Sequence, residues 1–262
     1  MKFYKMHGLG NDFIIINAIN ENISIDKLNI KKLANRNIGI GFDQLLLLQP
    51  SKNADVLCKI YNSDGSEASQ CGNGMRCVAR FLHEQKLKSG AKLSIETISG
   101  IVDANIDSYD KISVEMGEPS FSTNEKHIIK TPNNKSFESH LLSIGNDHLI
   151  VFVDKLDMNH LSEINNLIQN NFTQFNGINA GFAEILDKNN IELKTFERGA
   201  GKTLACGSNA CAAVCAGIKN NKLNNKVKVS LPHGNLLIEW SGNDQDPVMM
   251  TGPASYVYCG EI

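Results

Sequence analysis

Closely spaced cysteine pairs are missing from this chain, although it contains seven cysteines among 262 residues. No two of them show the CxxC spacing that is typical of structural zinc sites. An odd and scattered set in a chain of this length also argues against a disulfide framework. We therefore expect reduced thiols, and Cys58, Cys77, Cys211 and Cys215 lie in apolar patterns that favour a place in the core.

Basic clusters and long apolar runs are missing as well. The net charge is −2, so the sequence gives no electrostatic reason to expect a nucleic acid or an anionic membrane as partner. The longest apolar runs, Leu45–Leu48 and Leu149–Val153, are too short to span a bilayer. The opening residues lack the apolar core of a signal peptide, so we expect a cytoplasmic protein.

Two of the cysteines stand at an unusual place. Cys71 in "SQCGNG" and Cys206 in "LACGSN" each precede a glycine, and a helical pattern follows directly. A helix N-terminus has N–H groups without an intrahelical partner and a partial positive charge, which stabilises a thiolate. These two thiols are the ones we expect to be reactive.

The chain repeats itself with a shift of 135 residues. "LGNDFIII" at Leu9–Ile16 falls over "IGNDHLIV" at Ile144–Val151, and Cys71-Gly72 falls over Cys206-Gly207 (206 − 71 = 135). A period this long with two copies does not fit a solenoid. It predicts two similar halves, each of a size that suits one domain.

Strand-like runs dominate both halves, and each half has one main helical pattern, at Gly74–Lys86 and Asn209–Lys219. Further helices are expected over Ile25–Asn35 and roughly Leu161–Gln169. The second pattern is apolar all round, which is typical of a helix enclosed by strands. We expect an α/β (α+β) protein with a first half at 1–116, a second half at 117–251 and "MGEPSFST" (Met116–Thr123) as the join.

Paired thiols on similar halves indicate a particular chemistry. If both helix starts face one cleft, one thiolate can remove an α-proton while the other thiol returns a proton to the opposite face. The N–H groups of both helices would stabilise the charge that develops on the substrate carboxylate. A thiol-redox protein stays open as an alternative, although such proteins usually carry CxxC.

Several motifs resemble those of the diaminopimelate epimerase family, and the likeness extends from Lys5 to about Thr251. The motifs are "KMHGLGNDF", "GIGFDQLL", "NSDGSEASQCGNGMRC", "GNDH", "NAGFAEI", "ERGAGKTLACGSNACAA" and "LPHGNLLIEW". The resemblance implies two pseudo-symmetric halves, each a mixed, curled sheet around a central helix, with the active site in the cleft between them and residues 252–262 returning to the first half. It also implies a homodimer, no cofactor and no metal.

The implied reaction interconverts LL- and meso-diaminopimelate by two-base proton transfer, for lysine and peptidoglycan synthesis. Another cofactor-independent racemase, of the proline or hydroxyproline type, stays open as the nearer alternative. The resemblance implies Cys71 and Cys206 as the catalytic pair. It implies a substrate-binding set of Asn11, Gln44, Asn62, Gly72, Asn73, Asn146, His148, Asn179, Glu197, Arg198, Gly207 and Ser208.

Each polar residue of this set also has an ordinary structural explanation. The Asn residues of "GND" and "NSDG" are good turn formers, and a lone His148 among apolar residues is more often a core residue. Three positions depart from the family pattern: Asp147, Lys202 and Asn209 replace residues that are usually Pro, Glu and Gly. We expect Asn209 to be tolerated because Asn accepts unusual backbone angles.

Overall fold

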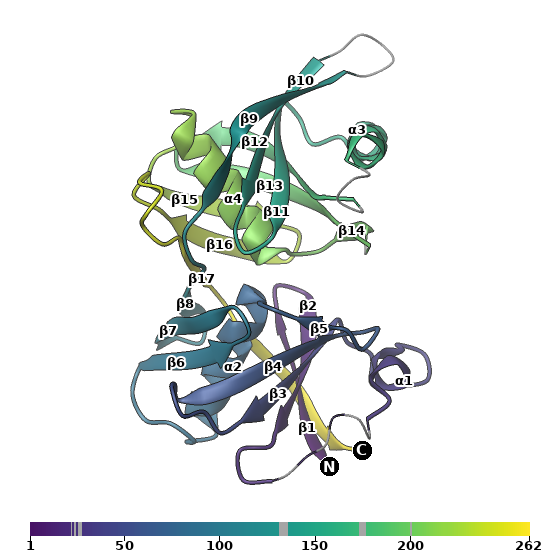
Figure 1. The fold of residues 1–262 in the computed structure, drawn as a ribbon, viewed down its shortest axis with the longest axis vertical. Coiled ribbons are helices and arrows are strands. Elements are labelled where there is room, and N and C mark those ends of the chain that lie inside the picture. The colour runs from purple at the N-terminus through teal and green to yellow at the C-terminus, as the bar shows by residue number, and fades with distance from the viewer. Residues whose placement is uncertain (22, 24, 26–27, 131–135, 173–176, 200) are drawn as a thin grey trace. The chain divides into compact units, whose positions relative to one another are not determined.

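The computed structural model describes residues 1–262 except 22, 24, 26–27, 131–135, 173–176 and 200 (Figure 1). The chain divides into two compact units. Unit 1 comprises Met1–Glu115 and Thr251–Ile262, and unit 2 comprises Met116–Met250. The boundaries expected from the sequence lie within one residue of these. Helices that are long and apolar enough to cross a membrane do not occur among the described residues.

Unit 1 is a mixed sheet. Antiparallel pairs join β18 to β1 and β1 to β2, a parallel pair joins β2 to β3, and β3 pairs antiparallel with β4. Beyond β4 come the short antiparallel β5, the parallel β6, and then β7 and β8 in antiparallel order. The strands are β1 (Lys2–Gly8), β2 (Asn11–Asn17), β3 (Gln44–Gln49), β4 (Val56–Asn62), β5 (Glu67–Ala68), β6 (Lys92–Thr97), β7 (Gly100–Ser108), β8 (Lys111–Glu115) and β18 (Ser255–Glu261).

Unit 2 repeats this order of pairings. Antiparallel pairs join β9 to β10 and β10 to β11, β11 and β12 are parallel, and β12 pairs antiparallel with β13. The short β14 and the parallel β15 follow on β13, and β16 closes the series. The strands are β9 (Ser120–Lys130), β10 (Ser136–Ser143), β11 (Asp147–Val153), β12 (Asn179–Asp187), β13 (Asn190–Glu197), β14 (Gly201–Thr203), β15 (Lys226–Leu231) and β16 (Gly234–Glu239); β17 (Met249–Gly252) crosses the boundary between the units.

The register of the two sheets is equivalent as well as their topology. Phe13 pairs with Gln44 in unit 1, and His148, 135 residues further along, pairs with Asn179 in unit 2. A symmetric duplication of one α/β unit accounts for this agreement. The predicted class, with two similar halves built from mixed sheets, is confirmed.

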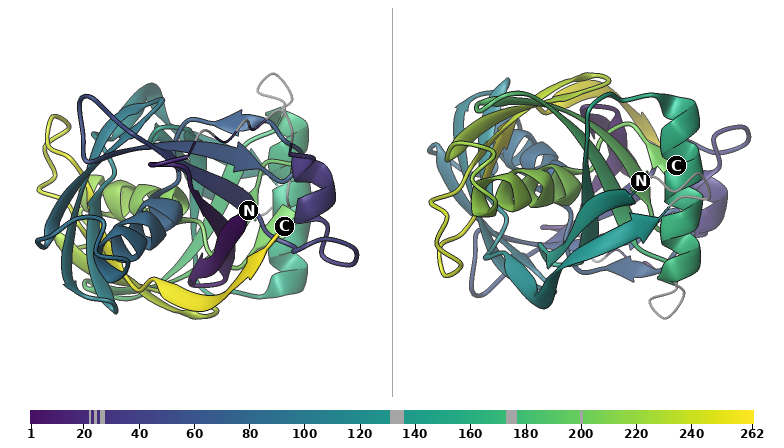
Figure 2. Two further views of the ribbon diagram at one scale, coloured as in Figure 1. Left: turned by 90° about the horizontal axis from the view of Figure 1, so that it is seen from below. Right: turned by 90° about the horizontal axis from the view of Figure 1, so that it is seen from above.

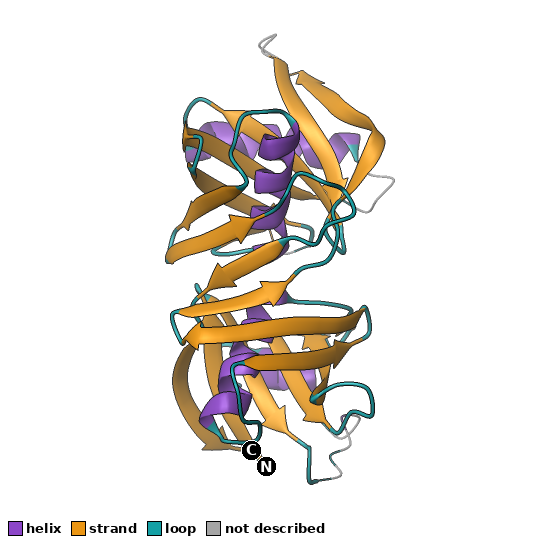
Figure 3. Ribbon diagram, turned by 90° about the vertical axis from the view of Figure 1, so that its left-hand side faces the viewer, coloured by secondary structure: helices purple, strands orange, loops and turns teal. Residues whose placement is uncertain are grey.

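A central helix lies against the strands of each unit: α2 (Gly72–Glu84) in unit 1 and α4 (Gly207–Lys219) in unit 2 (Figures 1 and 3). Helix α2 contacts β1, β2, β7 and β8, and α4 contacts β10, β11, β12 and β16. Every residue from Asn209 to Gly217 in α4 is buried. The small side chains of this helix allow the strands to approach it on all sides.

Two further helices cover the outer faces of the sheets. Helix α1 (Ile30–Ala34) packs on Ile14, Ile16 and Leu45, and α3 (Met158–Asn171) packs on Leu149, Val151 and Phe182 (Figure 1). Strands β2, β3, β11 and β12 are therefore covered on both faces, which explains their continuous apolar runs.

Two expectations about these segments are wrong. The join placed at Met116–Thr123 ends early, because Ser120 already begins β9, which pairs with β10. A helix expected over Ile25–Asn35 begins at Ile30, because the Asn29 side chain accepts a hydrogen bond from the Lys32 N–H and so caps the helix there. Residues 26–27 of that range lie outside the described residues.

The two chain ends meet in unit 1. The Met1 ammonium donates to the Ile262 carbonyl at 2.6 Å, and the Ile262 N–H donates to the Met1 carbonyl at 2.9 Å (Figure 2). The last strand, β18, runs antiparallel to β1 from Lys2 to His7. The return of residues 252–262 to the first half is thereby confirmed.

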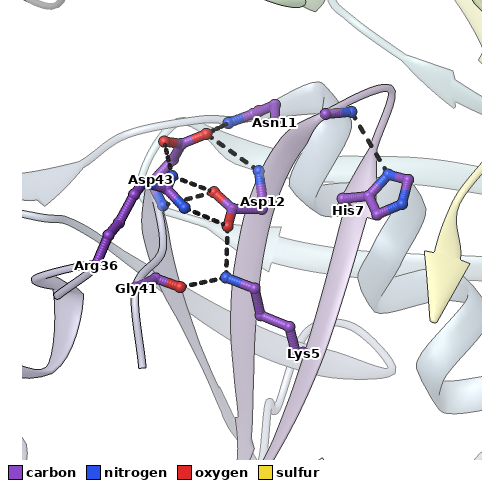
Figure 4. A network of polar contacts seen from close by, with 8 residues as sticks. Lys5, His7, Asn11, Asp12, Arg36, Gly41 and Asp43 are labelled. Atoms are coloured by element: carbon purple, nitrogen blue, oxygen red, sulfur yellow. Dashed lines mark hydrogen bonds and ion pairs between the residues drawn. The ribbon is translucent and has the colours of Figure 1, made fainter. Parts of the chain in front are cut away.

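An ion-pair network ties the start of β2 to the segment before β3 (Figure 4). The Asp12 carboxylate accepts from Lys5 and from both terminal nitrogens of Arg36, and Arg36 also donates to Asp43 at 2.9 Å. The Asp12 side chain is 14% exposed. Burial, the largest influence, raises the pKa of Asp12, but Arg36 and Lys5 together lower it to about 2.

This network predicts a stability that depends on pH. The folded pKa of Asp12, about 2, lies below its ordinary value of 3.8, so its contribution is complete above pH 4 and is lost as the pH falls towards 2. Asp12→Asn should lower the free energy of unfolding at pH 7 by about 2 kcal/mol. Urea unfolding at several pH values measures this, with exposed Asp103→Asn as control. A gap to the wild type that persists at pH 2 would contradict the assignment.

A second prediction concerns the contact between β12 and α4. A Cβ at Gly181 would lie 2.1 Å from Asn209 Oδ1 and 2.8 Å from Ile150 Cδ1. Gly181→Ala should therefore destabilise the protein by about 1–3 kcal/mol, as overpacking does. Adding Asn209→Gly removes the closest atom and should recover part of the loss. Melting temperatures of the two single variants and the double variant test this coupling, and strictly additive losses would contradict it.

Candidate active site

Cys71 and Cys206 occupy the same position in their units. Each is the N-cap residue of its central helix with an extended backbone, and neither side chain caps the helix. The Cys71 carbonyl accepts from the Met75 N–H at 2.9 Å, and the Cys206 carbonyl accepts from the Ala210 N–H at 3.1 Å. Both thiols are thus held where the helix dipole favours a negative charge.

The cysteines expected in the core are indeed buried: Cys58, Cys77, Cys211 and Cys215. Burial raises the pKa of the Cys58 and Cys215 thiols well above the ordinary range and that of Cys77 to about 12. The Cys58, Cys77 and Cys215 thiols therefore remain protonated at neutral pH. No disulfide joins any of the seven cysteines, all of which belong to the described part of the chain.

Three polar side chains gather around the start of α2. Cys71 Sγ lies 3.8 Å from Asn11 Oδ1, and Asn73 Nδ2 donates to the same oxygen at 3.1 Å. Arg76 Nη2 donates to Asn73 Oδ1 at 2.9 Å, and the Arg76 side chain is fully buried. The structure therefore brings Asn11, Gly72 and Asn73 together with the thiol.

Gln44 and Asn62 lie opposite each other at one end of two neighbouring strands. Gln44 begins β3, Asn62 ends β4 directly opposite it, and Gln44 Nε2 donates to Asn62 Oδ1 at 2.9 Å. Asn11 begins β2, which is parallel to β3, so all three residues stand at the same end of these strands. The Gln44 Oε1 atom is buried without a hydrogen-bond partner within the described residues.

Unit 2 carries an equivalent group at the start of α4. Cys206 Sγ lies 3.5 Å from the Ser208 hydroxyl oxygen. Asn179 begins β12, and its side chain accepts from the Arg198 N–H at 3.0 Å and donates to the Asp147 carbonyl at 3.2 Å. Asn179 thereby joins the end of β13 to the start of β11.

His148 and Asn146 form a pair in this unit. His148 Nε2 lies 2.8 Å from Asn146 Oδ1, which as an acceptor assigns the proton to Nε2. Burial lowers the pKa of His148 to about 3, so the imidazole is neutral at physiological pH. Its Nδ1 atom is buried and has no hydrogen-bond partner among the residues that the structure describes.

Glu197 and Arg198 follow one another where β13 ends, opposite the start of β12. Glu197 is half-buried and Arg198 is exposed. The counterpart of Glu197 in unit 1 is Asn62. Unit 2 therefore has a carboxylate at the end of the strand where unit 1 has an amide. No cluster of three or more potential metal-binding His, Cys, Asp or Glu side chains occurs within the described ranges.

Two residues with a part in this site escaped the sequence analysis. Arg76 fixes the Asn73 amide, and Asp43 accepts from Asn11 Nδ2 at 2.9 Å. An arginine inside the apolar pattern of a buried helix, in "GMRCVA", was the available signal for the first. Asp43 gave none, because an acid in a loop of the "GFDQ" kind is common in turns.

Comparison with known proteins gives matches over nearly the whole chain. The family model described as diaminopimelate epimerase matches residues 3–122 and 140–257. Proteins named diaminopimelate epimerase from Nitrosomonas europaea and Nitrosospira multiformis are 41% and 40% identical over 272 residues, covering 100% of this chain and 98% of each relative. One of the same name from Coxiella burnetii is 40% identical over the same spans.

Solved structures share the fold at lower identity. A hydroxyproline epimerase from Agrobacterium vitis matches with a TM-score of 0.78 and 14% identity, covering 100% of this chain and 90% of that one. A PhzF-family phenazine biosynthesis protein from Bacillus anthracis matches with a TM-score of 0.77 and 17% identity, covering 100% and 98%. Near-complete coverage by the family model and by relatives at about 40% identity shows that the chain belongs to the diaminopimelate epimerase family.

Proposed function

We propose that this protein interconverts LL- and meso-diaminopimelate, with Cys71 and Cys206 as its acid/base pair and no cofactor. The observation that supports the proposal most directly is the N-cap position of one thiol on each of two equivalent helices, in a chain that the family model matches at residues 3–122 and 140–257. A second thiol at the matching place is what a reaction on both faces of one carbon requires.

The proposed reaction has two proton transfers. One cysteine, as the thiolate, takes the α-proton of the substrate, and the other, as the thiol, gives a proton to the opposite face. The carbanion charge spreads into the α-carboxylate, which the first-turn N–H groups at Gly72–Asn73 and Gly207–Ser208 would stabilise. Each cysteine is the base in one direction and the acid in the other.

The second amino-acid head of diaminopimelate needs its own binding residues. We assign it to the amides Asn62, Asn146 and Asn179 together with Glu197 and Arg198, with Asn11, Gln44 and His148 nearer the reacting centre. A guanidinium can hold a carboxylate with two hydrogen bonds, and Glu197 can accept from an ammonium group. This charged pair separates the proposal from a proline-type racemase, because proline has no second head.

The setting follows from the same reaction. We propose a cytoplasmic enzyme that supplies meso-diaminopimelate for lysine and peptidoglycan synthesis and works as a homodimer. Support for the homodimer comes from β18, where Tyr256, Val257 and Tyr258 are all more than a third exposed. Exposed apolar side chains in succession are typical of an association surface.

The function is tested by proton NMR of the reduced protein with LL-diaminopimelate in D₂O. We expect loss of an α-proton signal and appearance of the meso isomer, and a fall of about a thousandfold or more in Cys71→Ala and Cys206→Ala. Proline and glutamate in parallel tubes are the substrate controls, and a Cys259→Ala protein controls for thiol loss. Exchange with proline alone would show that the substrate is proline rather than diaminopimelate. No exchange with any of the three amino acids would favour a thiol-redox protein.

The binding of the distal head gives a separate prediction. Arg198→Gln should raise KM by about tenfold to a hundredfold, because a charged hydrogen-bond pair is lost, and should change kcat much less. Lys228→Gln removes an exposed cation from β15 and serves as control. Steady-state kinetics measure both variants. An unchanged KM in Arg198→Gln would exclude this residue from the substrate site.

A further inference from the structure

The Asp43 carboxylate reaches the Cys71 thiol through a single side chain. Its Oδ2 accepts from Asn11 Nδ2 at 2.9 Å and from the Asp12 N–H at 3.1 Å, and its Oδ1 accepts from Arg36 at 2.9 Å (Figure 4). Because the same Asn11 amide lies 3.8 Å from Cys71 Sγ, Asp43 can act on the thiol through Asn11.

A carboxylate only accepts hydrogen bonds, so it decides which end of the Asn11 amide faces it. The nitrogen is held at Asp43, and the oxygen is turned the other way. That oxygen lies 3.8 Å from Cys71 Sγ and 3.1 Å from Asn73 Nδ2. The orientation of the amide follows from these contacts, because the flipped amide would place donors against donors.

A second fixed charge supports the same orientation from the opposite side. Arg76 only donates, and its Nη2 donates to Asn73 Oδ1 at 2.9 Å. The Asn73 nitrogen is thereby turned towards Asn11. Arg76 is anchored in turn by the Pro253 carbonyl, which accepts from its Nε at 3.2 Å.

An amide oxygen beside a sulfur accepts from S–H but repels a thiolate, so it favours the protonated form. The helix N-terminus acts in the opposite sense. We propose that Asp43 is a positioning residue for the epimerisation: it holds the Asn11 amide with its oxygen towards Cys71 and so keeps this thiol protonated before substrate binds. The catalytic meaning rests on the proposed function, whereas the effect on the thiol does not.

The polar neighbours of Cys206 in unit 2 differ from those of Cys71 in unit 1. The oxygen of Asn146, which is equivalent to Asn11, lies against His148 Nε2 at 2.8 Å, and Cys206 has the Ser208 hydroxyl at 3.5 Å. A hydroxyl can donate to a thiolate. The Ser208 hydroxyl therefore does not oppose a thiolate at Cys206 in the way that the Asn11 oxygen opposes one at Cys71.

Other titratable groups surround the Asn11 contact. They are Asp12, Lys5 and Arg36 behind Asp43, His7 beside Gly10, Arg76 behind Asn73, and the buried thiols Cys58 and Cys77 near Cys71. Burial keeps both neighbouring thiols neutral across the pH range in which Cys71 titrates. The Asp12 carboxylate and the Arg36 guanidinium keep their charge over that range.

The test measures how fast iodoacetamide alkylates Cys71 between pH 5 and 10, resolved from the other cysteines by peptide mass spectrometry. In Asp43→Ala the midpoint for Cys71 should fall by about one pH unit, so that alkylation below the midpoint is about tenfold faster. The Cys206 midpoint should stay where it is. In the same variant kcat should fall by about tenfold, with its pH profile displaced in the same direction as the Cys71 midpoint.

Arg36→Met is the matched control, because it removes charge from the same network but leaves the Asp43 contact with Asn11. The Asp43 side chain is 43% exposed, so we expect Asp43→Ala to fold, and Asp43→Leu fills the same space if it does not. An unchanged Cys71 midpoint in the folded Asp43 variant, or an equal fall in Arg36→Met, would overturn the proposal. If the Cys71 midpoint shifts in Asp43→Ala but the wild type has no epimerase activity, the proposed function is rejected and the positioning role stands.

Discussion

Close packing around a fully enclosed helix is the constraint on which this structure depends. Helix α4 buries every residue from Asn209 to Gly217, and nearly all of them are small. A larger side chain on this helix would push a strand away, since protein interiors have no spare volume. Because the strands fix the helix along its length, they also fix its first turn, where Cys206 stands. The site is precise because the core behind it is rigid.

The duplicated pattern explains how far the sequence could go. Equivalent spacing of "GND" and "CG" predicted two similar halves, and the pairings of β2 with β3 and of β11 with β12 have the same register. The start of each central helix was also predictable, within two residues, from the Cys-Gly pairs. The periodicity of apolar residues and the residue types at helix N-termini are local signals. Local signals predict local structure, and the structure has the expected strands and the expected starts of both central helices.

Contacts between distant segments were outside the reach of the sequence. Asn209 was expected only to be tolerated, on account of its backbone angles. It lies inside α4, where its side chain also donates to the Ala180 carbonyl at 3.1 Å. Likewise, the Asp43 side chain acts on the Asn11 amide of another segment, and Arg76 is anchored by the distant Pro253 carbonyl. The start of β9 was missed because Gly117 and Pro119 with polar neighbours are typical of a loop, which placed the join at Met116–Thr123. Such features depend on which distant segments come into contact, and this cannot be predicted from the local pattern of a single sequence.

The meeting of the two chain ends has a consequence for synthesis on the ribosome. Unit 2 is one continuous segment, Met116–Met250, inserted into unit 1, whose last strand pairs with its first. Unit 2 can therefore complete its fold as soon as its own residues have emerged, whereas unit 1 must wait, with one edge of β1 uncovered, for residues near the end of the chain. The unit that is begun first is the unit that is finished last.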